Sequence, residues 1–305
     1  MKGLKVMGMM RMMMMKPHSF ISFRNASAVR ASFNSYGYDN IRDSDYDDDD
    51  DYEMYEPNHK TVANELNKIE PFSLIIPGIG KGENVKTHCY KLQNGVVMMK
   101  NYVSLRDQAE IVKTCQEYGM GPGGFYQPIT RFGGKLNLHM MCFGRNWDPV
   151  TKYNSIYRGN DGSEAPPIPE QLVSLAAKSI QDCKASDDCM PSMDPDICIV
   201  NFYAANTGRL GLHQDRDESE SSLKKGLPVV SVSIGDSAKF VYGDTRYVRR
   251  ANRVLLESGD VLVFGGKSRH VFHGVTKIIP NSAPPSLIQQ TDLRPGRLNL
   301  TFRQY

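Results

Sequence analysis

Short apolar runs of strand length fill the C-terminal half of the chain, separated by Gly, Asp and Asn. In residues 229–234 Val or Ile alternates with Ser, and a period of two is typical of a β-strand. Several short strands with turn residues between them predict a sandwich or barrel. The expected strands are residues 197–203, 229–234, 240–242, 254–257, 261–264 and 298–303.

Further upstream the apolar period changes to that of helices. Ser104 can cap a helix over residues 105–118, and residues 167–182 form a second candidate with prolines near its start. Residues 95–103 are expected to form one more strand, and the two helices to pack outside the strands. The apolar stripe of the first helix is Ala109, Ile111, Val112 and Cys115.

Residues 125–165 show weak periodicity, with basic residues placed between aromatic ones. Because aromatic rings stack on bases and cations contact phosphates, the stretch suits a nucleotide-recognition lid. An irregular segment whose aromatics form their own small core is the alternative. His139 is expected to be structural rather than a ligand.

The N-terminal segments differ sharply in charge, which the net charge of +3 hides. Residues 1–38 carry six basic residues and no acid, which is typical of a transit peptide, and we expect a chloroplast or mitochondrial protein, with nucleus or cytoplasm as the alternative. Residues 39–57 carry ten acids and one base. We therefore expect residues 39–60 to be a disordered acidic linker, 61–94 an N-terminal extension and 95–305 the main domain.

The remaining composition favours a soluble protein of a reducing compartment. Six cysteines are scattered along the chain without a CxxC pair, and no apolar run is long enough to span a bilayer. We expect no membrane partner, and a monomer.

His213 and Asp215 lie two positions apart, so on a strand they would point to the same side and could chelate one ion. A third ligand has to come from elsewhere, and His270 and His273 are the candidates. Two histidines and one carboxylate leave positions open on the ion, which is the arrangement in non-haem iron(II) oxygenases.

The last expected strand places Arg297 and Arg303 on one face, together with Asn299 and Thr301. Two arginines in a half-buried strand are costly unless anions pair with them. A small dicarboxylate offers one carboxylate to each guanidinium. 2-Oxoglutarate, the dicarboxylate that iron oxygenases use, is the candidate.

The second half of the chain resembles the AlkB family of Fe(II)- and 2-oxoglutarate-dependent dioxygenases. The resemblance covers about residues 195–305. It rests on NFY (201–203), LHQDRDE (212–218), PVVSVS (228–233), SGDVLVFGG (258–266), FHG (272–274) and RLNLTFRQ (297–304).

The resemblance implies a double-stranded β-helix core, a jelly-roll of the cupin type that is mainly β with flanking helices. It also implies Fe(II), 2-oxoglutarate and O2 as cofactors. It selects His273 over His270 as the third metal ligand beside His213 and Asp215. The implied cosubstrate residues are Asn201, Tyr203, Arg297, Asn299 and Arg303.

The implied substrate residues are Asp217, which would contact the base, and Phe143, which stands in the lid where the family has a tyrosine. The chain also departs from the family at Tyr247, because the bacterial enzyme has at this position a basic residue that contacts nucleic acid. Four surrounding arginines are candidates to replace it: Arg246, Arg249, Arg250 and Arg253.

The activity that the resemblance implies is oxidative removal of N-methyl groups from bases in DNA or RNA, with release of formaldehyde, succinate and CO2. A dioxygenase acting on a protein or a small molecule is one alternative. A non-enzymatic nucleic-acid-binding protein is another, although such a protein needs neither the ligand set nor the arginine pair.

Overall fold

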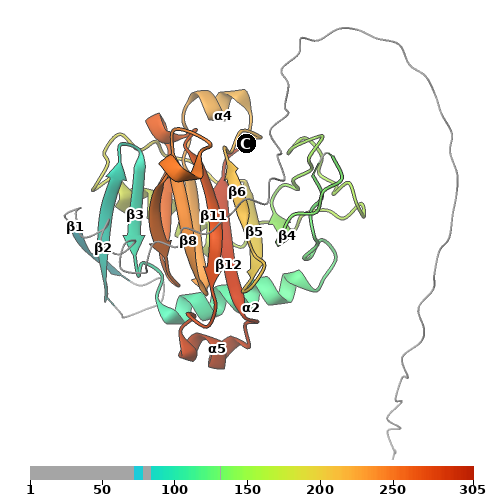
Figure 1. The fold of residues 1–305 in the computed structure, drawn as a ribbon, viewed down its shortest axis with the longest axis horizontal. Coiled ribbons are helices and arrows are strands. Elements are labelled where there is room, and N and C mark those ends of the chain that lie inside the picture. The colour runs from blue at the N-terminus through green and yellow to red at the C-terminus, as the bar shows by residue number, and fades with distance from the viewer. Residues whose placement is uncertain (1–71, 78–83, 131) are drawn as a thin grey trace, which may run out of the picture. The chain divides into compact units, whose positions relative to one another are not determined.

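The computed structural model describes residues 72–77, 84–130 and 132–305. The basic leader, the acidic linker and part of the N-terminal extension lie outside the described residues. The described residues form a mostly β structure in which two sheets pack against each other (Figure 1).

Eight strands form the larger sheet, in the order β1-β2-β3-β10-β7-β12-β5-β4. All neighbouring pairs are antiparallel. The last strand in the chain, β12, lies near the centre, between β7 and β5. The strands are β1 Phe72–Pro77, β2 Asn84–Gln93, β3 Val96–Lys100, β4 His139–Phe143, β5 Ile197–Ala204, β7 Val229–Gly235, β10 Val261–Phe264 and β12 Gly296–Arg303.

The smaller sheet has four antiparallel strands in the order β6-β11-β8-β9. Two sheets of antiparallel strands that pack face to face and exchange strands along the chain form the jelly-roll core that we predicted. The strands are β6 Leu210–His213, β8 Ser237–Gly243, β9 Asn252–Leu256 and β11 Phe272–Ile279.

Helices cover the face of the larger sheet that points away from the smaller one. The helix α2 begins after Ser104, whose side chain accepts a hydrogen bond from the backbone N–H of Asp107, as the sequence predicts. Figure 1 shows α5 beside α2, on the side of the sheets away from α4. The helices are α2 Leu105–Gly119, α3 Glu170–Cys183, α4 Glu220–Lys224 and α5 Pro285–Thr291, with short 3-10 turns at Val248–Arg250 and Gly266–Ser268. In the described part of the chain, no helix has the length and apolar character needed to cross a bilayer.

The strands of the larger sheet contribute to two separate apolar clusters, because successive side chains point to opposite faces. Val230 and Val232 pack toward the helices, whereas Val229 packs toward the smaller sheet. The second cluster joins the two sheets through residues such as Phe240 and Phe264. This layer between the sheets also holds the polar pocket described below.

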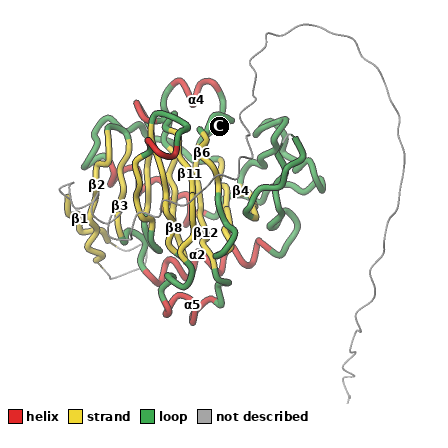
Figure 2. Tube along the Cα trace, in the orientation of Figure 1, coloured by secondary structure: helices red, strands yellow, loops and turns green. Residues whose placement is uncertain are grey.

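The stretch expected to form a lid, residues 125–165, is mainly irregular (Figure 2). Among its described residues, β4 is the one strand, and the other β contacts are isolated bridges. The aromatic residues of this stretch differ in burial, and its role as a lid stays a prediction. Tyr153 is buried, while Phe132 and Tyr157 are exposed. Arg158 is buried and donates hydrogen bonds to the carbonyls of Gly123 and Gly124, which fastens the two ends of the stretch together.

Candidate metal and cosubstrate site

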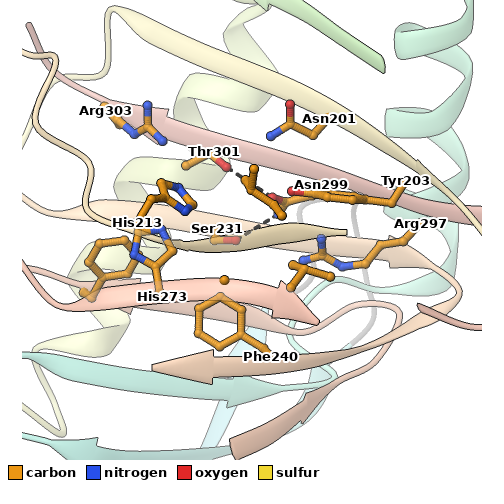
Figure 3. Close-up of a pocket in the computed structure, with 14 residues that line it drawn as sticks. Asn201, Tyr203, His213, Ser231, Phe240, His273, Arg297, Asn299, Thr301 and Arg303 are labelled. Atoms are coloured by element: carbon orange, nitrogen blue, oxygen red, sulfur yellow. Dashed lines mark hydrogen bonds between the residues drawn. The ribbon is translucent and has the colours of Figure 1, made fainter. Parts of the chain in front are cut away.

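His213 and His273 lie directly opposite each other on the neighbouring strands β6 and β11. Their ring centroids are 4.5 Å apart (Figure 3). Each ring points Nδ1 at a backbone carbonyl, that of Gly211 for His213 and that of Val271 for His273. Both rings are thereby oriented with Nε2 available to an ion, as in many metal sites.

Asp215 completes the group, since its ligand oxygens and the two histidine nitrogens all lie within 4.8 Å of one another. Its carboxylate is 3.6 Å from Nε2 of His213 and 3.7 Å from Nε2 of His273. His213 and Asp215 do not share a strand, contrary to the prediction, because β6 ends at His213 and Asp215 lies in the irregular segment that follows.

The charges around these three residues suit a divalent cation. Burial raises the pKa of Asp215, but Arg303 and the two histidines outweigh it and hold the pKa of Asp215 well below its usual range. Burial, together with His213, lowers the pKa of His273 to about 4. The site therefore offers a carboxylate and a neutral imidazole at neutral pH, the forms that bind metals.

Arg297 is 1% exposed and has no carboxylate partner among the described residues. Its Nη2 donates to the hydroxyl of Ser233, while Nε and Nη1 have no hydrogen-bond partner. Burial lowers the pKa of Arg297 to about 10, which still leaves the guanidinium charged at neutral pH. A buried cation with free donors is a site prepared for an anion.

Arg303 has a different environment, although it lies on the same face of the same strand. Its guanidinium pairs with Asp215 at 2.8 Å and with Glu218 at 3.3 Å, and it donates a hydrogen bond to the hydroxyl of Tyr153. The prediction of one cosubstrate carboxylate for each arginine stays a prediction, and the two arginines differ in the partners that the protein itself gives them. Arg297 is open to an anion, whereas protein carboxylates already pair with Arg303.

The other residues expected to hold the cosubstrate line the same pocket. The register of the sheet places Tyr203 opposite Arg297, and Asn201 opposite Asn299. The side-chain carbonyl of Asn201 has no partner, whereas the amide nitrogen of Asn299 donates to Ser231 and to the carbonyl of Val232. Figure 3 shows these side chains between the histidines and Arg297.

Asp217 lies at the edge of the site and contacts the segment expected to form a lid. The indole N–H of Trp147 donates to its carboxylate at 2.7 Å, and Nζ of Lys152 lies 2.9 Å from it. Trp147 was not among the predicted site residues. Its being the single tryptophan of the chain, within a stretch of basic and aromatic residues, is the signal that could have identified it.

Two residues considered at first lie away from the pocket. Phe143, expected to contact the substrate, is fully buried in the cluster between the larger sheet and the helices, in edge-to-face contact with Tyr118. The position is on β4, but its side chain points to the face opposite the pocket, so we correct that assignment. His270 is exposed and is not part of the group that could hold an ion.

Comparison with known proteins agrees with this geometry. A family model of the 2OG-Fe(II) oxygenase superfamily matches residues 95–303. The Alpha-ketoglutarate-dependent dioxygenase AlkB of Escherichia coli is 35% identical over 183 residues, which are 59% of this chain and 77% of that protein. The chain belongs to the AlkB family.

Other members of the AlkB family are more similar to this chain. The DNA N(6)-methyladenine demethylase ALKBH1C of Arabidopsis thaliana is 57% identical over 224 residues, 70% of this chain and 49% of that protein. The solved structure of OsALKBH1 is 49% identical, with a TM-score of 0.68, and the match covers 71% of this chain and all of that one. The chain spans about half the length of the Arabidopsis relatives that it matches.

The cofactors of the AlkB family, Fe(II), 2-oxoglutarate and O2, fit the residues of the site. Two imidazoles and one carboxylate are the ligand set of non-haem iron oxygenases. Nε and Nη1 of Arg297 and the side-chain carbonyl of Asn201 are buried polar atoms without a hydrogen-bond partner in the described part of the chain. Such atoms are rare in folded proteins, and a bound ligand accounts for both.

Proposed function

We propose that this chain is a dioxygenase that removes N-methyl groups from bases of DNA or RNA. The observation that carries the proposal is one pocket lined by both histidines of the group that could hold an ion and by Arg297, whose Nε and Nη1 have no hydrogen-bond partner among the described residues. The name of the Arabidopsis relative supports a methylated base as substrate, and N6-methyladenine in DNA is the first candidate to test.

When bound, Fe(II) and 2-oxoglutarate supply with O2 the oxidising power to hydroxylate a C–H bond. His213, Asp215 and His273 would hold the ion, and Arg297 would bind the carboxylate of the cosubstrate. Arg303 keeps Asp215 ionised. A hydroxylated N-methyl group then separates from the base as formaldehyde, and the nitrogen regains its hydrogen.

Trp147 and Asp217 supply features that suit recognition of the base. An ionised carboxylate accepts hydrogen bonds only, so Asp217 can accept one from an exocyclic amine. An indole beside it offers a surface on which a base can stack. A base in a duplex would have to leave the stack to reach this position.

The segment that joins β8 to β9 supports a nucleic acid as the larger partner. Arg246, Arg249 and Arg250 are exposed on it, next to the exposed Tyr247. The guanidinium of Arg246 lies 5.9 Å from the ring centre of Phe272, the residue before the ligand His273. Cations at the edge of the site can contact phosphates on either side of the base.

Two measurements test the proposal. Anaerobic addition of Fe(II) and 2-oxoglutarate should produce a weak visible absorption band, which His213→Ala abolishes. Incubation with oligonucleotides containing N6-methyladenine, N1-methyladenine or N3-methylcytosine should release formaldehyde from at least one. Absence of the band and of cosubstrate turnover would overturn the oxygenase assignment. Turnover without formaldehyde from any oligonucleotide would point to a protein or small-molecule substrate.

A further inference from the structure

Four charged residues form a closed ring of contacts that includes the metal ligand Asp215; the other three are Glu218, Arg269 and Arg303. Arg269 donates a hydrogen bond from Nη1 to the backbone carbonyl of Asp215 at 2.8 Å, and its Nη2 pairs with Glu218 at 2.9 Å. The other oxygen of Glu218 lies 3.3 Å from Nε of Arg303, whose Nη2 returns to the carboxylate of Asp215. Each of the four residues is at most 9% exposed.

The ring fixes a part of the chain, the segment after β6, that no strand pairing holds. Residues 214–219 after β6 have no regular structure, so the sheet fixes His213 but not Asp215. Arg269 comes from the turn before β11, four residues ahead of the ligand His273. Its bond to the carbonyl of Asp215 therefore ties the ligand without a strand to the segment that carries the third ligand.

The ring also balances charge, with two carboxylates against two guanidinium groups. Glu218 is the one carboxylate of the ring that is not a metal ligand. If a side chain without charge replaced Glu218, Asp215 would be the one carboxylate left to Arg303 among its present partners. Arg303 would then compete with the ion for the carboxylate of Asp215. One buried positive charge near the ion would also lose its compensation, which disfavours a divalent cation.

We propose that Glu218 and Arg269 are positioning residues for the metal ligand Asp215. Glu218 draws Arg303 partly away from Asp215, and Arg269 fixes the backbone that carries the ligand. The inference rests on the metal site of the proposed function but not on its substrate. Asp217, between the two acids of the ring, points instead to Trp147 and Lys152.

The test measures metal binding directly. The dissociation constant of Mn(II), which air does not oxidise, is determined by calorimetry for the full chain and its variants. Glu218→Gln removes the charge, and Arg269→Lys keeps the charge but removes the fork that bonds two groups at once. We expect each to weaken Mn(II) binding by about tenfold to a hundredfold, the usual effect of residues that support metal ligands.

Arg158→Lys is the matched control. Arg158 is a buried arginine that pairs with Asp161 and donates to the carbonyls of Gly123 and Gly124, and it belongs to no metal-ligand segment. It should lower the melting temperature while leaving the Mn(II) dissociation constant unchanged. A loss of metal affinity in Arg158→Lys as large as in Arg269→Lys would show that general loosening explains both, and would overturn the proposal.

The affinity for 2-oxoglutarate at saturating Mn(II) gives a second readout. Glu218→Gln makes the site more positive, so it should weaken the binding of the anion less than the binding of the cation. Equal losses of both ligands would contradict the role assigned to Glu218. Wild-type Mn(II) affinity in both ring variants would also overturn the proposal, whereas a wild-type chain that binds no metal would instead refute the proposed function.

Discussion

Arg297 and Arg303 are the same residue type on the same face of β12, six positions apart, yet their surroundings give them different roles. Arg297 faces the hydroxyl of Ser233 and the ring of Tyr203, and none of the described acidic residues forms an ion pair with it. Arg303 faces Asp215 and Glu218. Burial lowers the pKa of Arg303, but attraction to these two carboxylates outweighs burial and raises the pKa above its usual range. The neighbours from other segments of the chain, not the residue type, decide which arginine is free to bind an anion.

Arg297→Met should therefore separate cosubstrate binding from metal binding. Loss of one partner of a buried charge pair costs about 2–5 kcal/mol, so affinity for 2-oxoglutarate should fall steeply while Mn(II) affinity stays the same. Without cosubstrate the variant should melt at a higher temperature than the wild type, because it no longer buries an unpaired cation. Calorimetry and thermal unfolding check the two effects, and a lower melting temperature would contradict this account of Arg297.

Phe143→Ala tests the corrected position of that side chain. Removing a phenyl ring from a close-packed core costs about 3–5 kcal/mol, so the variant should unfold at a clearly lower denaturant concentration. Mn(II) and 2-oxoglutarate should still bind with wild-type affinity where the variant is folded. A stable variant that has lost only activity on methylated oligonucleotides would restore the original assignment of Phe143 to the substrate site.

Among the elements, the segment between β8 and β9 carries the prediction about nucleic acid. Arg249→Gln and Arg250→Gln should each weaken binding of an oligonucleotide to a similar extent for all sequences. Each lost phosphate contact should also reduce the slope of log affinity against log salt by about 1. Lys113→Gln on the exposed face of α2 is the control, and an equal effect there would show attraction by net charge alone.

Elements with a strong local pattern could be predicted from the sequence, and those that depend on distant partners could not. The strands β5, β7, β10 and β12 and the helix α2 appear where alternation or capping indicates them. The pairing of β6 with β11 was not predicted: a strand was assumed at His213 without a partner, and none was expected at His273. The two strands are about sixty residues apart, and no local sequence pattern indicates the register that sets His213 opposite His273.

The site shows the same division. The three residues that could hold an ion follow from motifs that the family shares, and the structure brings them together as a group. The ring through Glu218 and Arg269 and the contact between Trp147 and Asp217 join segments far apart in the chain. Such contacts depend on how loops pack, which neither periodicity nor spacing encodes.

For the whole molecule, the position of the site between two sheets links ligand binding to overall stability. The ligands lie on the smaller sheet and the segment after β6, and the arginines lie on the larger sheet. Mn(II) with 2-oxoglutarate should raise the melting temperature, since a ligand at a hundred times its dissociation constant stabilises the folded state by about 2.7 kcal/mol. Thermal unfolding with and without the ligands measures this shift, which should be absent in His213→Ala.

The place of β12 also sets an order of events during synthesis. Residues 296–303 insert between β5 and β7, both of which leave the ribosome earlier. Until β12 has been synthesised, the larger sheet is in two parts, and the edges of β5 and β7 that pair with β12 have no strand to bind. Since both arginines arrive on that strand, a growing chain can assemble the histidines before it can bind the cosubstrate. The strand β12 thus joins the two parts of the sheet and completes the anion site in one step.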